Sequence, residues 1–178
     1  MQSEPTRVEL GDYIRPIPDF PKPGILFRDI TPLLANPRAF QQAIDELARW
    51  AGSRTVDVIA ATEARGFLFA APLALQLGVP LAPIRKKGKL PYQTLSYTYE
   101  LEYGRDTVEM HVDAIPPGAG VLMVDDLLAT GGTMEACCRL VEKAGGRVVA
   151  CAFLVELKGL EGVKKLAGYD TFSLIQYD

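Results

Sequence analysis

The sequence predicts an α/β protein built on a mostly parallel central sheet with helices on both faces. Its 178 residues, 48% of them hydrophobic and 23% charged, are typical of one globular domain with a sizeable core. Short, almost continuously apolar segments alternate with longer segments of helical character, as in parallel sheets covered on both faces. Only the region around residues 95–112 alternates apolar and polar residues as a half-exposed antiparallel hairpin does.

The expected elements follow along the chain. Pro37 suits the first turn of a helix that runs to about Trp50. Helices are also expected at residues 66–77 and 132–144, because Gly78 and Gly145 follow them in the position that ends a helix. Within the first of these, Pro72 requires a kink or a place in the first turn. Apolar runs predict strands at residues 56–61, 81–85, 121–124, 148–157 and 172–177.

A hairpin is expected to interrupt the parallel pattern. Apolar residues occupy every second position from Leu95 to Tyr103 and again from residue 108 to 112, with a turn expected at residues 104–106. Glu100 and Glu102 fall on the polar face of this hairpin, opposite Tyr103. The hairpin, about residues 92–113, is a candidate flap. We assign no role to His111, the sole histidine.

Charge and cysteine usage exclude several classes of protein. The net charge of −3 argues against a broadly basic surface that binds nucleic acid, and no apolar run is long enough for a membrane span. A polar N-terminus argues against secretion. The three cysteines, two of them adjacent at Cys137 and Cys138, fit neither a disulfide framework nor metal-ligand spacing. We therefore expect a cytoplasmic protein that binds neither nucleic acid nor membrane.

The stretch from Val121 to Thr133 is the most informative part of the sequence. A buried strand ends in Asp125 and Asp126 and leads through Thr-Gly-Gly-Thr into a helix. Ligands in open α/β sheets bind beyond the carboxyl ends of the strands, where this loop is expected. Amides at a helix start attract anions, and glycines let the backbone approach them closely. Residues 129–133 therefore predict a cradle for a phosphate.

The two acids identify the rest of the ligand. Carboxylates beside a phosphate would repel it unless they face another part of the same molecule, and a ribose diol can donate hydrogen bonds to them. We infer a ribose 5-phosphate. The alternative is a structural turn in which Thr130 or Thr133 caps the helix and the acids favour its positive end. The endings typical of ATPase loops and dinucleotide loops are both absent from this stretch.

Two further segments carry cations that could meet phosphate oxygens. Arg65 lies just after the strand at residues 56–61 and offers a planar, forked donor, although it could equally be a surface residue beside a helix start. Arg85, Lys86, Lys87 and Lys89 form a dense basic cluster. Their mutual repulsion would be relieved by a bound anion, although a solvated basic loop is the alternative.

At these residues the chain resembles the type I phosphoribosyltransferases. Residues 121–133 are similar to the family's phosphoribosyl pyrophosphate signature, and residues 19–30, 64–69, 84–91 and 101–104 resemble the members that act on adenine. The resemblance runs from about residue 14 to 177. It implies transfer of the 5-phosphoribosyl group from phosphoribosyl pyrophosphate to N9 of adenine, giving AMP and pyrophosphate. It further implies a homodimer and Mg²⁺ held mainly by substrate and water, with no direct protein ligand.

The resemblance also assigns roles to particular residues. The ribose 5-phosphate is expected to contact Asp125, Asp126, Ala129, Thr130, Gly131, Gly132 and Thr133. Pyrophosphate is expected to contact Ala64, Arg65, Arg85, Lys86 and Lys89, with a cis peptide bond between Ala64 and Arg65. Adenine is expected to contact Leu26, Phe27, Arg28 and Leu127, with Phe27 stacked on the base. The catalytic residues are expected to be Glu102, which assists proton transfer, Tyr103, which helps close the site, and Arg65.

We expect a single domain over residues 1–178, in which about residues 1–36 form a hood over the base. Two other functions remain open. One is a phosphoribosyltransferase for an oxopurine, and the other is a regulator that senses phosphoribosyl pyrophosphate without catalysis. A regulator would need a domain that binds nucleic acid, and both the length and the net charge of the chain argue against one. A purely structural domain would have no use for the ordered acid and glycine loop.

Overall fold

The computed structural model describes residues 7–101 and 104–178, and the chain divides into two compact units, Met1–Glu46 and Leu47–Asp178. In the first unit the 3-10 helix η1 (Leu10–Tyr13) precedes strand β1 (Arg15–Pro18), which pairs antiparallel with β2 (Leu26–Asp29). Helix α1 (Thr31–Ala35) follows, and α2 (Pro37–Ala51) begins at the predicted proline. The two short strands had no counterpart among the expected elements.

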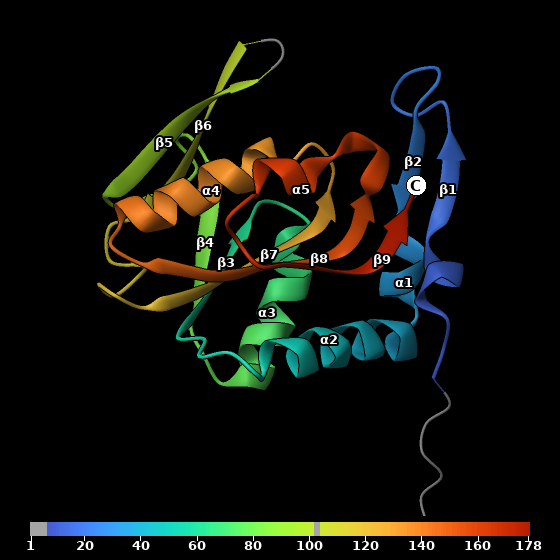
Figure 1. The fold of residues 1–178 in the computed structure, drawn as a ribbon, viewed down its shortest axis with the longest axis horizontal. Helices are drawn as coiled ribbons and strands as arrows, with labels where there is room; N and C mark the ends of the chain where they lie inside the picture. The colour runs from blue at the N-terminus through green and yellow to red at the C-terminus, as the bar shows by residue number, and fades with distance from the viewer. Residues whose placement is uncertain (1–6, 102–103) are drawn as a thin grey trace, which may run out of the picture. The chain divides into compact units, whose positions relative to one another are not determined.

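The second unit contains a seven-stranded sheet in the order β5-β6-β4-β3-β7-β8-β9. Its parallel strands are β3 (Val58–Thr62), β4 (Leu81–Lys86), β7 (Gly120–Leu128), β8 (Arg147–Leu157) and β9 (Thr171–Tyr177). Helices α3 (Gly66–Leu77) and α4 (Gly132–Lys143) cover opposite faces of the sheet (Figure 1). The short elements η2 (Lys158–Leu160) and α5 (Gly162–Lys165) connect β8 to β9. The predicted fold class is confirmed.

Strand β7 is longer than predicted. Its pairing with β8 continues to the pair Leu128↔Glu156, four residues beyond the expected end at Val124. Asp125 and Asp126 therefore lie inside the strand rather than after it, which corrects the sequence prediction. The reason is that backbone pairing with β8 holds the strand extended where the apolar run has already ended.

The glycines predicted to end the helices do so. Gly78 is the C-cap of α3 with a φ of 69°, and Gly145, just after the C-cap of α4, has a φ of 87°. These left-handed conformations favour glycine. Pro72 lies inside α3, well beyond its first turn, so the expectation that it could occupy the first turn is wrong.

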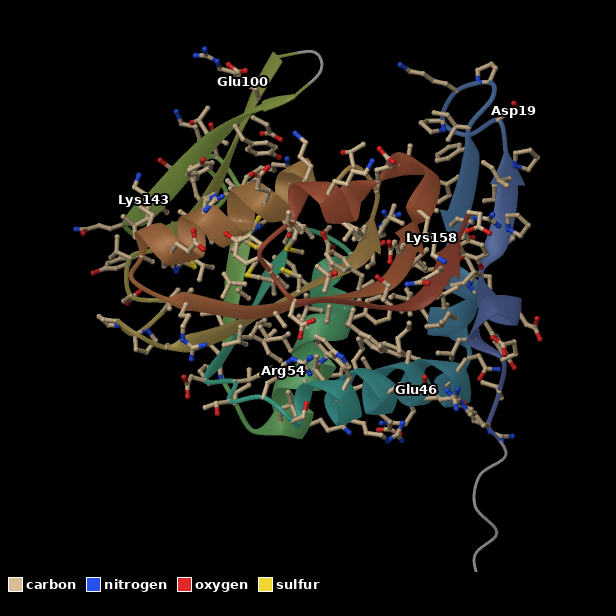
Figure 2. All side chains as sticks on the ribbon, in the orientation of Figure 1. Asp19, Glu46, Arg54, Glu100, Lys143 and Lys158 are labelled. Carbon is tan, nitrogen blue, oxygen red and sulfur yellow. The ribbon has the colours of Figure 1, made fainter. Side chains whose placement is uncertain are left out.

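Strands β5 (Thr94–Leu101) and β6 (Gly104–His111) form the predicted antiparallel hairpin at one edge of the sheet. The predicted turn at residues 104–106 is wrong, because these residues belong to β6 and Arg105 pairs with Glu100. The observed register places Leu95 opposite Met110 and so aligns the apolar residues of both strands. Glu100 extends from the outer part of the hairpin and is highly exposed (Figure 2).

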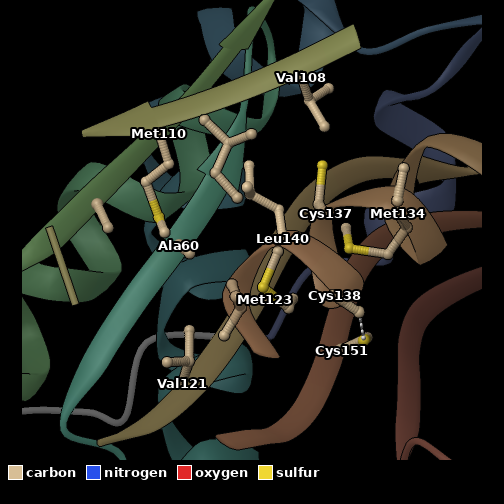
Figure 3. Close-up of a cluster of buried hydrophobic side chains, with 14 of the residues drawn as sticks. Ala60, Val108, Met110, Val121, Met123, Met134, Cys137, Cys138, Leu140 and Cys151 are labelled. Carbon is tan, nitrogen blue, oxygen red and sulfur yellow. Dashed lines mark hydrogen bonds between the residues drawn. The ribbon is translucent and has the colours of Figure 1, made fainter. Parts of the chain in front are cut away.

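One hydrophobic core cluster of the second unit lies between the sheet and α4. Met110, Met123 and Leu140 are fully buried there and pack around the cysteines (Figure 3). All three cysteines are buried free thiols, and the sulfur atoms of Cys138 and Cys151 lie 3.6 Å apart.

No helix among the described residues is both long enough and apolar enough to cross a membrane.

Candidate active site

A pocket of about 360 Å³ lies at the carboxyl ends of β3 and β7. Because neighbouring parallel strands end at the same edge of a sheet, segments far apart in the sequence meet here. The lining residues are 62–65, Lys86 and 125–134. Most residues expected to bind the donor therefore lie around one cavity.

The start of α4 forms one wall of this pocket. Gly131 is the N-cap of the helix, has a φ of 80°, and makes no side-chain capping bond. The structural alternative, in which Thr130 or Thr133 caps the helix, is therefore wrong. The first amides of a helix have no partners within the helix, so they are available to an anion here. The hydroxyl of Thr133 lies 3.1 Å from the hydroxyl of Tyr99, which belongs to β5.

Asp125 and Asp126 form a pair of shielded carboxylates beside the loop. Asp126 is only 6% exposed, and its Oδ2 atom forms an ion pair with Arg65 Nε at 2.8 Å. Asp125 Oδ1 accepts the backbone N–H of Asp126 at 2.9 Å. Burial raises the pKa of Asp125, and the neighbouring charge of Asp126 raises it further. Burial also raises the pKa of Asp126, an effect that Arg65 partly offsets.

The raised pKa of Asp125 has a consequence for stability. Above the raised pKa, the folded protein holds a charge that burial disfavours, so the free energy of unfolding falls as pH rises through the interval between the unfolded and folded pKa values. We expect Asp125→Asn to raise the Tm of the ligand-free protein at neutral pH by roughly 2–4 °C per kcal/mol recovered. The gain should disappear below about pH 4, where the wild-type carboxyl is protonated in both states.

Thermal unfolding of both proteins between about pH 3 and 8 measures this difference, because the range extends below the ordinary pKa of an aspartate. A variant whose Tm lies below that of the wild type across the whole range would show that the ionised Asp125 carboxylate stabilises the fold.

Glu63 organises the opposite side of the pocket, and the sequence analysis assigned it no role. Its carboxylate accepts hydrogen bonds from Arg85 Nη2 at 2.9 Å and from the backbone N–H of Lys86 at 2.5 Å. Burial acts to raise the pKa of Glu63, but these partners outweigh it and hold the pKa below its ordinary value. The only sequence signal was its position at the end of β3, directly before Ala64.

The basic cluster is less available to an anion than the sequence predicted. Arg85 pairs with Glu63, and the ammonium group of Lys86 contacts the carboxylate of Asp106. A carboxylate just after β3 and another in β6 therefore already relieve the repulsion for two of these cations. Lys86 lines the pocket, whereas Arg85 and Lys89 are not among its lining residues.

The cis peptide bond lies one residue earlier than expected, between Glu63 and Ala64. Arg65 already has right-handed helical dihedral angles as the N-cap of α3. Arg65 lines the pocket at the start of this helix.

The residues expected to contact adenine belong to both units. Leu26, Phe27 and Arg28 belong to β2 of the first unit, where the ring of Phe27 meets that of Phe20 edge-on at 5.2 Å. Leu127 lines the pocket. Glu102 and Tyr103 lie outside the described residues. Within residues 7–101 and 104–178, no three His, Cys, Asp or Glu side chains gather so as to hold a metal ion.

Comparison with known proteins places these features in a family. Residues 31–177 match the model of the phosphoribosyl transferase domain. The chain is 58% identical over 169 residues to an adenine phosphoribosyltransferase from Maridesulfovibrio salexigens, covering 95% of this chain and 99% of the relative.

Solved structures agree with this relationship. The adenine phosphoribosyltransferase of Thermoanaerobacter pseudethanolicus superposes with a TM-score of 0.92 at 57% identity, covering 94% of this chain and 98% of the other. The enzyme of Saccharomyces cerevisiae, solved with adenine and an imino-altritol bisphosphate, superposes with a TM-score of 0.87 at 42% identity, covering 93% and 96%. The chain therefore belongs to the adenine phosphoribosyltransferase family.

Proposed function

We propose that this chain transfers the 5-phosphoribosyl group from phosphoribosyl pyrophosphate to N9 of adenine, giving AMP and pyrophosphate in purine salvage. The observation that carries the proposal is the pocket in which the start of α4 lies beside the shielded pair Asp125 and Asp126. Relatives that share 53–58% of their residues with this chain bear the name of this activity.

The loop binds the phosphate of ribose 5-phosphate, and the two acids bind its ribose. Amides at the start of α4 and the hydroxyl of Thr133 donate hydrogen bonds to the phosphate ester. Asp125 and Asp126 accept hydrogen bonds from the ribose hydroxyls. Positive charge develops on the ribose as the bond to pyrophosphate breaks, and two fixed carboxylates close to the ring stabilise that charge in the transition state.

The leaving pyrophosphate is held by the cations of the opposite wall. Arg65 contacts Asp126 and lines the pocket, so it can reach from the ribose side to the leaving group. Lys86 supplies a second cation, and we include Ala64, Arg85 and Lys89 by resemblance to the family. The hard carboxylate oxygens of Asp125 and Asp126 fit Mg²⁺, which substrate oxygens and water would mainly hold. Mg²⁺ would neutralise negative charge on the leaving pyrophosphate.

The base side of the proposal rests on resemblance to the family. Adenine N9 attacks C1 of the ribose, the bond from C1 to the pyrophosphate oxygen breaks with inversion, and Glu102 assists proton transfer at the imidazole nitrogens. Phe27 stacks on the base, a contact that any base would make. Selectivity for adenine therefore comes from hydrogen bonds made by main-chain groups near Leu26 and Arg28. Tyr103 helps to exclude water, which would hydrolyse the donor.

A homodimer belongs to this proposal. Helix α3 exposes Leu68, Ala71 and Leu75 along one stripe, and Leu75 is 85% exposed. Contiguous apolar patches on a protein surface commonly mark an interface, so we place α3 in the contact between two copies. We also place the protein in a reducing compartment such as the cytoplasm, because its three cysteines fit no disulfide framework in the sequence.

A base-competition assay tests the proposed function. Radiolabelled adenine, hypoxanthine, guanine and xanthine are offered with phosphoribosyl pyrophosphate, with and without Mg²⁺. We expect AMP and pyrophosphate from adenine alone, and only with Mg²⁺. Nucleotides formed from the other bases would support the oxopurine enzyme instead. Donor binding without turnover of any base would support the regulator.

A further inference from the structure

The hydroxyl of Tyr99 lies at the centre of a hydrogen-bonded group that joins the hairpin to both ends of the pocket. It is 3.1 Å from Thr133 Oγ1 and 3.2 Å from Asp106 Oδ2, and Lys86 Nζ donates to it at 3.3 Å. Thr133 and Lys86 line the pocket, whereas Tyr99 and Asp106 are not among the lining residues. The four side chains come from α4, β4, β5 and β6.

We propose that Tyr99 and Asp106 are positioning residues that prepare the two ends of the pocket for the sugar donor. Tyr99 holds the hydroxyl of Thr133 until the phosphate ester takes its place, and Asp106 holds Lys86 until the pyrophosphate group takes its place. The inference rests on the proposed function, because it needs a donor that carries a phosphate ester at one end and pyrophosphate at the other.

Counting protons explains the role of Tyr99. A threonine hydroxyl and a phenol each have a single proton to donate. Tyr99 donates its proton to Asp106 Oδ2 at 3.2 Å, so its oxygen accepts from Thr133 Oγ1 and from Lys86 Nζ. The phenol therefore holds the Thr133 hydroxyl until a phosphate oxygen takes the proton of Thr133 instead. A phenylalanine at residue 99 would keep the ring and remove this control.

The contact between Lys86 and Asp106 explains the second role. Burial acts to lower the pKa of Lys86, but its bonds to Asp106 and Tyr99 outweigh this and raise it. The bond from Lys86 correspondingly lowers the pKa of Asp106, so both groups are charged at neutral pH. A pyrophosphate that approaches Lys86 must compete with this carboxylate and is repelled by its charge. Asp106 thus keeps the ammonium in place while it limits the affinity for pyrophosphate.

The two roles can be separated with the two halves of the donor. Ribose 5-phosphate and magnesium pyrophosphate are titrated separately into the full-length protein by calorimetry. We expect Tyr99→Phe to tighten ribose 5-phosphate binding about three- to tenfold, because Thr133 no longer has to give up one hydrogen bond, with pyrophosphate affinity unchanged within about twofold. We expect Asp106→Asn to tighten pyrophosphate binding about three- to tenfold and to leave ribose 5-phosphate affinity unchanged.

The hairpin offers a matched control. Thr98 is exposed and its hydroxyl lies 2.9 Å from that of Thr107, so Thr98→Val removes a hydroxyl from the same strand outside the group around Tyr99. This variant should bind both ligands as the wild type does. Thermal unfolding checks that each variant folds. If Tyr99→Phe does not fold, Asp106→Asn still tests the inference.

Several outcomes would overturn the inference. Unchanged or weaker ribose 5-phosphate binding in Tyr99→Phe would do so, as would weaker pyrophosphate binding in Asp106→Asn. Loss of both affinities in both variants would show that the hairpin has only a structural role. If the wild type binds neither ligand, the proposed function fails as well. Wild-type binding with unaltered variants would overturn this inference alone.

Discussion

Asp126→Asn is expected to lower kcat/KM for phosphoribosyl pyrophosphate by about a hundredfold at saturating adenine. Removing one partner of a shielded, hydrogen-bonded charge pair typically costs about 2–5 kcal/mol. Asp126 is 6% exposed and forms an ion pair with Arg65 Nε at 2.8 Å. The amide would leave Arg65 without this charged partner and would accept hydrogen bonds from the ribose hydroxyls more weakly. Initial rates at varied donor concentration measure the effect.

Asp57→Asn is the matched control for this variant. Asp57 Oδ2 accepts the backbone N–H of Gly120 at 2.7 Å, at the opposite end of β7 from the pocket. The same chemical change is made there on a carboxylate that has no part in donor binding. We expect the control to keep kcat/KM within about twofold of the wild type. A wild-type rate in Asp126→Asn would undo the assignment of the ribose diol to these acids.

Gly131→Ala is expected to weaken ribose 5-phosphate binding at least about tenfold and to lower the free energy of unfolding by about 2 kcal/mol. Gly131 has a φ of 80°, a conformation that is unfavourable for alanine. A Cβ atom there would also lie 2.5 Å from the carbonyl oxygen of Gly162 and 3.1 Å from Lys165 Cβ. The loop must move away from α5, which displaces the amides that face the phosphate. Calorimetry and chemical denaturation measure the two effects.

Gly118→Ala separates backbone conformation from crowding. Gly118 also has a φ of 80°, but an added Cβ would meet no atom within 4 Å. This control should cost only about 1 kcal/mol of stability and leave ligand affinity unchanged. Equal behaviour of the two variants would contradict the claim that crowding against Gly162 displaces the loop from its binding conformation.

The parallel sheet could be predicted from the sequence because its strands are short apolar runs, which are typical of strands buried on both faces. Residues 147–157 form β8 where apolar residues are continuous, and Gly78 and Gly145 end helices because their left-handed φ values favour glycine. The end of β7 could not be predicted in the same way. Asp125 and Asp126 look like the start of a loop, and only pairing with β8 shows that the strand continues through them.

One wall of the candidate site could likewise be predicted from the sequence, whereas the other could not. Residues 129–133 were found because the strand, loop and helix of a phosphate cradle are contiguous in the chain. The opposite wall depends on pairings between strands, such as that of β4 with β6, which places Lys86 beside Val108 and brings its side chain to Asp106. Asp106 was expected in a turn, so its contact with Lys86 depends on a register that local pattern does not determine.

Calorimetric titration of the wild-type protein with the magnesium complex of phosphoribosyl pyrophosphate tests the central claim most directly. The claim is that the loop at residues 129–133, with Asp125 and Asp126, binds the 5-phosphoribosyl donor. We predict saturable heat with one site per chain, abolished by excess ribose 5-phosphate and not by ribose. A titration without heat of binding, or binding that ribose 5-phosphate fails to displace, would contradict the account.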